Sequence, residues 1–405
     1  MLSVLKHPVY AKLFGAQVIA LVGTGLLTVA LGLLAFDLAG VNGGAVMGLA
    51  MTIKMVAYVA VAPVISALTA RLPRKPLLIT ADLVRAAVAL CLPFITEAWQ
   101  IYVLIFLLQS ASATFTPAFQ ALIPSVLPRE ADYTRALSFS RLAYDLEALA
   151  SPALAALLLT VMSYHNLFAG TVVGFLGSAV LVLLTRLPAI APPDPSGFFD
   201  RLTRGVRTFF AVRELRGLLA LNFVVATSTA MVIVNTVVMV KGELGRTQPD
   251  AALLLGANGA GSMLVALVMP RLLERVDDHR VMLWGAAFLP AGLACAAAVL
   301  LLSSGASQWF LLLMVWFFLG AATSAALTPS SRLLRRNTDE RSAPAVFAAQ
   351  FSLSHACYLV TYPLAGSLGA LWGLPAVAVL LAGLGTAGVV ALGRAWPVKG
   401  TTAGG

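Results

Sequence analysis

Twelve apolar stretches, each long enough to cross a lipid bilayer as a helix, follow one another along this chain. A hydrocarbon core about 30 Å thick needs about 20 helical residues, because each residue rises about 1.5 Å. Only 11% of the residues are charged, and the mean hydropathy is +0.92. The sequence therefore predicts an all-α integral membrane protein. The predicted spans are residues 11–36, 44–69, 76–96, 99–124, 137–161, 165–187, 215–240, 249–273, 280–303, 307–328, 344–370 and 373–396.

Lys and Arg residues gather at alternate ends of these spans. With both termini in the cytoplasm, the inner segments hold 23 of the 27 Lys and Arg residues, whereas the outer loops hold only Lys241 and Arg246. Such an asymmetry follows the positive-inside rule for an even number of helices. It predicts a multi-pass protein of the plasma (cell inner) membrane with both termini cytoplasmic. It also accounts for the net charge of +10 without a nucleic-acid partner.

A segment unfit to span the membrane divides the chain in the middle. Residues 188–197 contain four prolines, and the next residues have the spacing of a short basic amphipathic helix, which is expected to lie on the anionic cytoplasmic leaflet. An ordinary inter-domain linker is the compatible alternative. The predicted domains are a six-helix bundle over residues 1–187, this linker over 188–214, and a second six-helix bundle over 215–405.

The two halves resemble each other weakly, in the same order along the chain. Thr116-Pro117 in the fourth span corresponds to Thr328-Pro329 in the tenth, and Pro152 corresponds to Pro363. Two pseudo-symmetric six-helix bundles are the architecture of many secondary transporters, with a binding site between the halves. Because proline removes a backbone hydrogen bond, both Thr-Pro pairs are predicted to break their helices beside the cavity.

Several motifs in the first half resemble the major facilitator superfamily, especially its drug-, macrolide- and siderophore-efflux branch. They are Phe-Gly-Ala-Gln-Val-Ile at 14–19, Asp-Leu-Val-Arg-Ala at 82–86, Thr-Pro-Ala at 116–118 and Pro-Arg-Glu at 128–130. The resemblance covers essentially the whole chain. It implies a transporter that works by alternating access and exports a small amphipathic organic solute of drug or siderophore type, in exchange for protons.

The chain also departs from the superfamily's motifs. The loop between helices two and three usually contains an aspartate in Gly-x-Leu-x-Asp-Arg-x-x-Arg, but here Ala70 occupies that position. In the antiporter motif of helix five, Glu147 stands where a glycine is usual. Helix four lacks the arginine of many proton antiporters, and Gln109 is the nearest polar group. These departures leave proton coupling less supported than the transporter fold.

Charged groups within a bilayer are costly and need a partner or a function. Five ionisable residues are predicted at membrane depth: Lys54, Arg141, Asp145, Glu147 and His355. Arg141 and Asp145 are four residues apart, so they can neutralise each other on one helix face. Glu147 lies about 200° around the helix from Asp145, away from that pair. A buried carboxyl group of this kind can take up and release a proton, which makes Glu147 the leading candidate for coupling.

The remaining site residues have alternative readings. Lys54 can neutralise a carboxylate, bind an anionic substrate or extend towards the surface, and His355 is equally explained as a hydrogen-bonded helix contact. Polar residues of helices one, four, seven and ten, with aromatic neighbours, are the expected substrate cavity: Gln17, Thr24, Gln109, Phe115, Thr116, Asn222, Asn235 and Thr323. A cytoplasmic gate is expected at Arg71, Arg74, Lys75, Asp82 and Arg85.

Other classes of protein fit the sequence less well. An enzyme is not indicated, because the chain has no HExxH, GxSxG or phosphate-binding motif and no cofactor motif. A channel would need polar rings supplied by several chains, whereas an internally duplicated chain is expected to act as a monomer. The serious alternative is export of a divalent metal such as nickel, with ligands from Asp145, Glu147, His355 and the asparagines.

Overall fold

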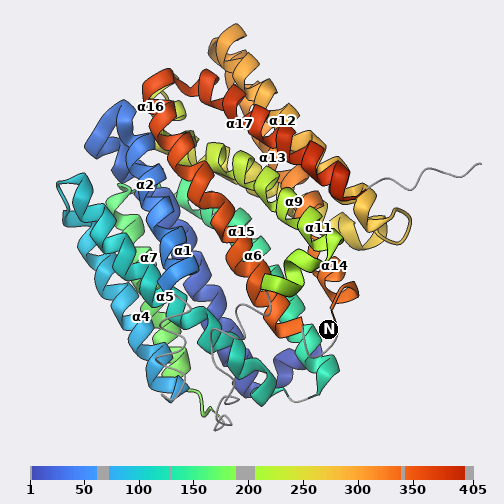
Figure 1. Cartoon of the computed structure of the whole chain (residues 1–405). Helices are drawn as coiled ribbons and strands as arrows, with labels where there is room; N and C mark the ends of the chain where they lie inside the picture. Colours follow the sequence, from blue (N-terminus) through green and yellow to red (C-terminus); the bar gives the residue numbers. More distant parts are fainter. Residues whose placement is uncertain (1, 62–72, 128, 188–205, 339–342, 397–405) are drawn as a thin grey trace, which may run out of the picture. The chain divides into compact units, whose positions relative to one another are not determined.

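The computed structural model describes the whole chain apart from residues 1, 62–72, 128, 188–205, 339–342 and 397–405 (Figure 1). All regular structure in the described residues is helical. The all-α fold predicted from the sequence is confirmed. The predicted cytoplasmic amphipathic helix lies mostly outside the described residues, although residues 206–211 are helical.

Contacts between Cα atoms divide the chain into two compact units. Unit 1 consists of residues 1–195 and 234–259, and unit 2 consists of residues 196–233 and 260–405. The sequence assigned 234–259 to the second bundle, but in the structure the Lys241 ammonium lies 3.0 Å from the Asp37 carboxylate. The domain limits drawn from the sequence remain a prediction.

Unit 1 contains six long helices and several short segments. Figure 1 shows α1 lying along α7, and α4 beside α5 and α7. The helices are α1 (Pro8–Ala39), α2 (Gly43–Val56), α4 (Arg74–Cys91), α5 (Ala98–Val126), α6 (Glu130–Leu158) and α7 (His165–Leu183), with the single-turn α10 (Thr236–Val238). The π-helical segments η3 (Ala57–Val61) and η6 (Met239–Glu243) follow α2 and α10.

Unit 2 is built around α9, which packs against α12, α15 and α17. Its helices are α9 (Arg213–Ala230), α12 (Asp278–Leu302), α13 (Gly305–Leu327), α14 (Ser330–Arg336), α15 (Ala343–Pro363), α16 (Gly369–Trp372) and α17 (Leu374–Ala395). The π-helical segment η5 (Met231–Asn235) continues α9, and η7 (Leu364–Leu368) follows α15. Helix α11 (Gln248–Leu272) contributes to both units.

Small residues let these helices approach closely, as in other membrane bundles. A Cβ atom added to Gly23 of α1 would lie 3.2 Å from the Thr171 carbonyl oxygen of α7. The Thr171 hydroxyl in turn donates a hydrogen bond of 2.9 Å to the Gly23 carbonyl. In unit 2, a Cβ on Gly285 of α12 would lie 2.7 Å from the Ala322 carbonyl oxygen of α13. Close backbone contact therefore holds neighbouring helices together in both units.

Nine stretches among the described residues are long and apolar enough to cross a membrane. The first, Pro8–Val61, is 54 residues long and contains both α1 and α2. Helices α6 and α15 coincide with predicted spans but are not among the nine, and the end of predicted span two lies outside the described residues. The multi-pass character is thus confirmed, and the exact number of twelve stays a prediction.

The two Thr-Pro pairs are not equivalent in the structure. Helix α5 continues without interruption through residues 116 and 117, whereas residues 328 and 329 form a turn between α13 and α14. The predicted symmetric breaks are therefore wrong for the first pair. A proline bends a helix only as far as neighbouring helices permit, so the dipeptide alone does not specify a break.

Candidate functional site

A cavity of about 60 Å³, room for a few water molecules, lies among α1, α4, α5 and α6 of unit 1. Its wall combines aromatic and aliphatic side chains with an amide, three hydroxyls and one guanidinium. The lining residues are Gln17, Ala20, Leu21, Thr24, Arg85, Phe115, Phe119, Ile123, Ser140 and Tyr144. Three residues predicted to form the substrate cavity, Gln17, Thr24 and Phe115, thus meet at one site. Such a mixture suits an amphipathic organic molecule.

The guanidinium in this wall belongs to Arg85, which the sequence assigned to the cytoplasmic gate. Arg85 pairs with the Asp82 carboxylate one turn earlier on α4, and both side chains are buried. The Arg85 guanidinium carbon also lies 4.4 Å from the centre of the Phe115 ring and 4.5 Å from that of Phe175. Two cation–π contacts and an ion pair together compensate for burial of the charge. Arg85 therefore lines the cavity, and Asp82 is its buried partner on α4.

Hydrogen bonds tie α1 to α6 across the same cavity. The Ser140 hydroxyl donates to the Gln17 side-chain oxygen over 3.0 Å, and the Tyr144 side chain also hydrogen-bonds Gln17. Thr24 instead donates to the Ala20 carbonyl of its own helix at 2.9 Å. Gln17 is thus the polar residue that connects the two helices at the site.

Glu147 of α6 lies against α1, close to this cavity. One of its carboxylate oxygens would be 2.6 Å from a Cβ atom added to Gly25. Lys54 of α2 interacts electrostatically with Glu147, and its ammonium lies 5.8 Å from the centre of the Tyr58 ring. Of the three alternatives for Lys54, the structure therefore favours partial neutralisation of a carboxylate.

Other predicted residues lie apart from the cavity or outside the described side chains. Gln109 of α5 is buried, and Arg74 and Lys75 begin α4. The side chains of Arg141, Asp145 and Thr116 are not described, and Arg71 falls within 62–72.

In unit 2, the predicted cavity residue Asn222 is buried on α9, and its side-chain nitrogen has no hydrogen-bond partner among the described residues. Thr323 is half-buried on α13. Asn235, buried at the end of η5, belongs to unit 1. The described side chains do not join these residues in a common pocket.

His355 lies in an aromatic row along α15. Its Nδ1 atom is 2.7 Å from the Phe351 carbonyl oxygen, and its ring centre is 4.2 Å from that of Phe351. Tyr358 and Tyr362 continue the row, with ring centres 5.0 Å apart. The hydrogen-bonded helix contact is therefore the interpretation of His355 that these distances favour.

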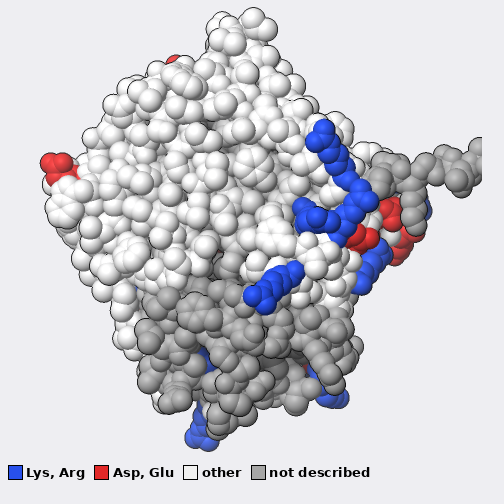
Figure 2. All heavy atoms as spheres, in the orientation of Figure 1, with Lys and Arg blue, Asp and Glu red and all other residues white. Residues whose placement is uncertain are grey.

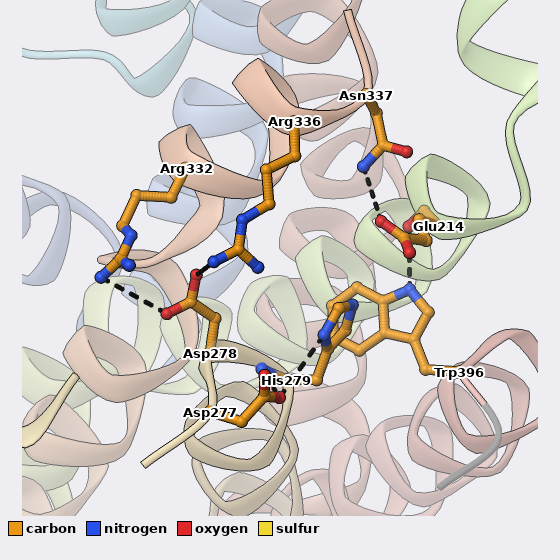
Figure 3. Close-up of polar contacts among 8 residues, drawn as sticks. All are labelled: Glu214, Asp277, Asp278, His279, Arg332, Arg336, Asn337 and Trp396. Carbon is orange, nitrogen blue, oxygen red and sulfur yellow. Dashed lines mark hydrogen bonds and ion pairs between the residues drawn. The ribbon is translucent and has the colours of Figure 1, made fainter. Parts of the chain in front are cut away.

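Figure 3 shows a polar network at one end of unit 2, which the sequence analysis did not identify. The buried Asp278 carboxylate lies 3.5 Å from Arg332 and 3.3 Å from Arg336. One Asp278 oxygen has no well-aligned hydrogen bond, so the Arg336 contact is mainly an ion pair. The sequence feature that could have indicated this network is the pair of acidic residues at 277–278 within a basic loop.

The same network fastens α17 to α9. The Trp396 indole nitrogen donates to the Glu214 carbonyl at 2.9 Å, and the Asn337 side chain donates to the Glu214 carboxylate at 2.6 Å. The His279 and Trp396 rings meet edge to face at 4.7 Å (Figure 3). These contacts hold the ends of α9, α12, α14 and α17 together.

Unit 1 also has an ion pair near helix ends, between Lys241 and Asp37. The Lys241 ammonium also lies 4.7 Å from the centre of the Phe36 ring. Burial and the neighbouring Asp37 carboxylate raise the pKa of Tyr164, which precedes α7. No group of three or more His, Cys, Asp or Glu residues able to hold a metal ion occurs among the described residues.

Comparison with known proteins finds macrolide efflux proteins among the relatives of this chain. Over 192 residues the chain is 29% identical to macrolide efflux protein A of Enterococcus faecalis, covering 44% of this chain and 58% of that protein. Over 225 residues it is 27% identical to macrolide efflux protein A of Streptococcus pyogenes, covering 53% of this chain and 54% of that protein. The matches thus span little more than half the length of these relatives.

Solved structures share the fold at low sequence identity. The nucleoside transporter NupG superposes with a TM-score of 0.71 at 14% identity, covering 96% of this chain and 100% of that one. A POT family transporter in complex with a thioalcohol-conjugated peptide has a TM-score of 0.73 at 11% identity, over 95% and 94% of the two chains.

The model of the Major Facilitator Superfamily matches the chain twice in succession, over residues 13–220 and 218–403. These successive matches agree with the internal duplication expected from the sequence, and together they cover nearly the whole chain. The chain therefore belongs to the Major Facilitator Superfamily and is a multi-pass membrane transporter.

Proposed function

We propose that this protein exports amphipathic organic solutes of the drug type by alternating access, in exchange for protons. The observation that carries the proposal is the chemistry of the side chains around the cavity of unit 1, a space that would widen during alternating access to admit such a solute. Phe115 and Phe119 offer apolar faces, while Gln17, Tyr144 and Arg85 supply a few polar contacts at fixed positions. Sequence similarity to two macrolide efflux proteins supports a solute of this class.

Glu147 is the proposed proton-carrying group. It belongs to the helix that forms one cavity wall, its carboxylate touches α1 at Gly25, and its electrostatic partner is Lys54. A carboxyl group held between an opposing helix and one lysine can change its partner when helices move. Protonation would weaken the attraction to Lys54, and this couples proton binding to helix position.

Transport measurements in everted membrane vesicles test the proposal. Vesicles that contain the protein should accumulate a labelled macrolide when a proton gradient is present, and a protonophore should abolish the accumulation. Vesicles without the protein serve as the control. Nickel uptake under the same gradient, with no macrolide uptake, would instead favour the metal-export alternative and overturn the proposal.

Substitutions in the cavity test its assignment as the binding site. Phe115→Ala removes an aromatic face, and Gln17→Ala removes the amide that bridges α1 and α6. Both variants should raise the concentration needed for half-maximal macrolide transport. Thr386→Ala on α17 of unit 2, whose hydroxyl only donates to the Ala382 carbonyl of its own helix, is the polar control and should leave this concentration unchanged. An unchanged concentration dependence in both cavity variants would remove this cavity from the transport path.

A further inference from the structure

A second hollow lies on unit 2, between α9, α15 and α17. It is an open groove of about 590 Å³, much larger than the cavity of unit 1. Its lining is apolar apart from one cation. The residues are Arg216, Leu219, Ala220, Phe223, Leu353, Ala356, Cys357, Ala387, Gly388 and Ala391.

Small side chains create the groove. Ala220, Ala356 and Ala387 contribute no more than a methyl group each, and each comes from a different helix. At Gly388, an added Cβ would lie 2.6 Å from Val224, so α17 already sits close to α9 there. The groove is therefore lined by small side chains from three helices and is open on one side.

The cation of the groove lies at one end of a membrane span. Arg216 is exposed and stands one turn after Arg213, the first residue of the span Arg213–Glu243. Phe223, also in the lining, lies two turns further along α9. An arginine at this depth reaches the headgroup level of a bilayer, while the residues after it lie at the level of the acyl chains.

Nearby groups leave the Arg216 guanidinium available. The Glu214 carboxylate is engaged by Asn337, and the Arg213 guanidinium donates to the Arg394 carbonyl over 2.6 Å. Within the described part of the chain, the Arg216 side chain takes part in no ion pair or hydrogen bond. Figure 2 shows several Lys and Arg side chains, with some Asp and Glu side chains beside them, in the region where Figure 1 draws α9, α14 and the end of α17, next to a broad uncharged surface.

We propose that this groove binds an anionic phospholipid, with one acyl chain along α9, α15 and α17 and the phosphate at Arg216. A guanidinium binds phosphate through two parallel hydrogen bonds, which suits it to a phospholipid headgroup. Anionic lipids are enriched in the cytoplasmic leaflet, which the charge asymmetry of the sequence assigns to this end of the helices. The proposal does not depend on the transported solute.

Native mass spectrometry of the detergent-purified full-length protein tests the site. The protein is titrated with phosphatidylglycerol or with phosphatidylcholine, and the bound lipid is counted. Wild type should retain phosphatidylglycerol in preference to phosphatidylcholine. Arg216→Gln should reduce that preference about fivefold, because one cation near an anionic headgroup contributes on the order of 1 kcal/mol. Arg216→Lys should keep most of it.

Two further variants test the groove itself. Ala387→Phe fills it and should reduce retention of both lipids, whereas Val390→Phe, on the exposed side of α17 outside the lining, should not. Arg275→Gln, an exposed arginine outside the groove, is the matched charge control. All variants should elute as monodisperse protein with unchanged melting curves.

Three results would overturn the proposal. Equal preference for phosphatidylglycerol in wild type and Arg216→Gln would show that Arg216 does not bind the lipid headgroup. Unchanged lipid retention in Ala387→Phe would show that the lipid does not occupy the groove. Displacement of the lipid by glycerol 3-phosphate would show a site for free phosphate groups rather than for a lipid.

Discussion

The interiors of the two units differ in where they keep their charges. In unit 1, Lys54, Asp82, Arg85 and Glu147 lie within helices, around or next to the cavity. In unit 2, the described Asp, Glu, Lys and Arg residues lie at helix ends, where Asp278 pairs with Arg332 and Arg336.

Away from its helix ends, unit 2 has polar and aromatic side chains instead. Its described helix interiors carry Asn222, Thr227, Ser228 and the aromatic row along α15. Buried charges are costly in a membrane and persist where they have a function or a partner. Under the proposed function, unit 1 carries the groups for ion coupling, whereas the charges of unit 2 hold helix ends together. Four experiments test this division.

The largest effect is expected from Glu147→Gln, which keeps the size and hydrogen-bonding capacity of the side chain but cannot titrate. The rate of gradient-driven transport should fall about tenfold or more, which corresponds to an increase of about 1.4 kcal/mol in the activation free energy. Substrate exchange without a gradient should persist, because the binding cavity is intact. Initial rates in everted vesicles, with and without a proton gradient, measure both.

His355→Gln is the matched variant in unit 2, since it removes an imidazole from the interior of α15. Its transport rate and pH profile should resemble wild type. If Glu147→Gln transports at the wild-type rate while His355→Gln does not, the assignment of coupling to unit 1 is wrong.

A smaller loss is expected from Gly25→Ala, which adds a methyl group where α1 touches α6. The new Cβ would collide with the Ser151 side chain and approach the Glu147 carboxylate. Overpacking of this kind costs about 1–3 kcal/mol, and it should lower the melting temperature and the transport rate together. Gly383→Ala is the control, because an added Cβ at Gly383 meets no atom within 4 Å. Equal melting temperatures for the two variants would contradict the close contact.

Asp278→Asn should destabilise unit 2 by about 1 kcal/mol, because Arg332 and Arg336 are half-exposed and water screens both ion pairs. Thermal unfolding in detergent measures the loss, which should shrink at high salt. If Asp278→Asn instead abolished transport and its dependence on protons, Asp278 would have a role in coupling, and the two units would not differ in this respect.

The smallest effect is expected at the pair formed by Lys241 and Asp37 in unit 1. Both side chains are partly exposed, so Lys241→Gln or Asp37→Asn should cost less than about 1 kcal/mol. A double-mutant cycle on thermal stability isolates the coupling between them. A variant with the two residues exchanged, Asp37→Lys with Lys241→Asp, should regain most of this coupling energy. A coupling energy near zero would mean that α1 and η6 are held by apolar contacts alone.

Local spacing in the sequence was enough for part of this description. The positions of the long helices follow from runs of apolar residues, because a helix must bury or satisfy its whole backbone within the bilayer. The spacing of Asp82 and Arg85 also allows the pair that the structure shows, since residues three apart share one helix face. The resemblance to the superfamily followed from several short motifs that occur in the expected order along the chain.

Only the tertiary structure decided what these helices bring together. Arg85 lies at the cavity between rings from α5 and α7, and Glu147 meets Gly25, a residue 122 positions earlier on α1. The sequence gives the angle of each residue around its own helix. It does not give the rotation of one helix against the next, because many side-chain contacts spread over the bundle set that rotation together. For the same reason the Thr-Pro pair at 116–117 leaves α5 unbroken, while the pair at 328–329 ends α13.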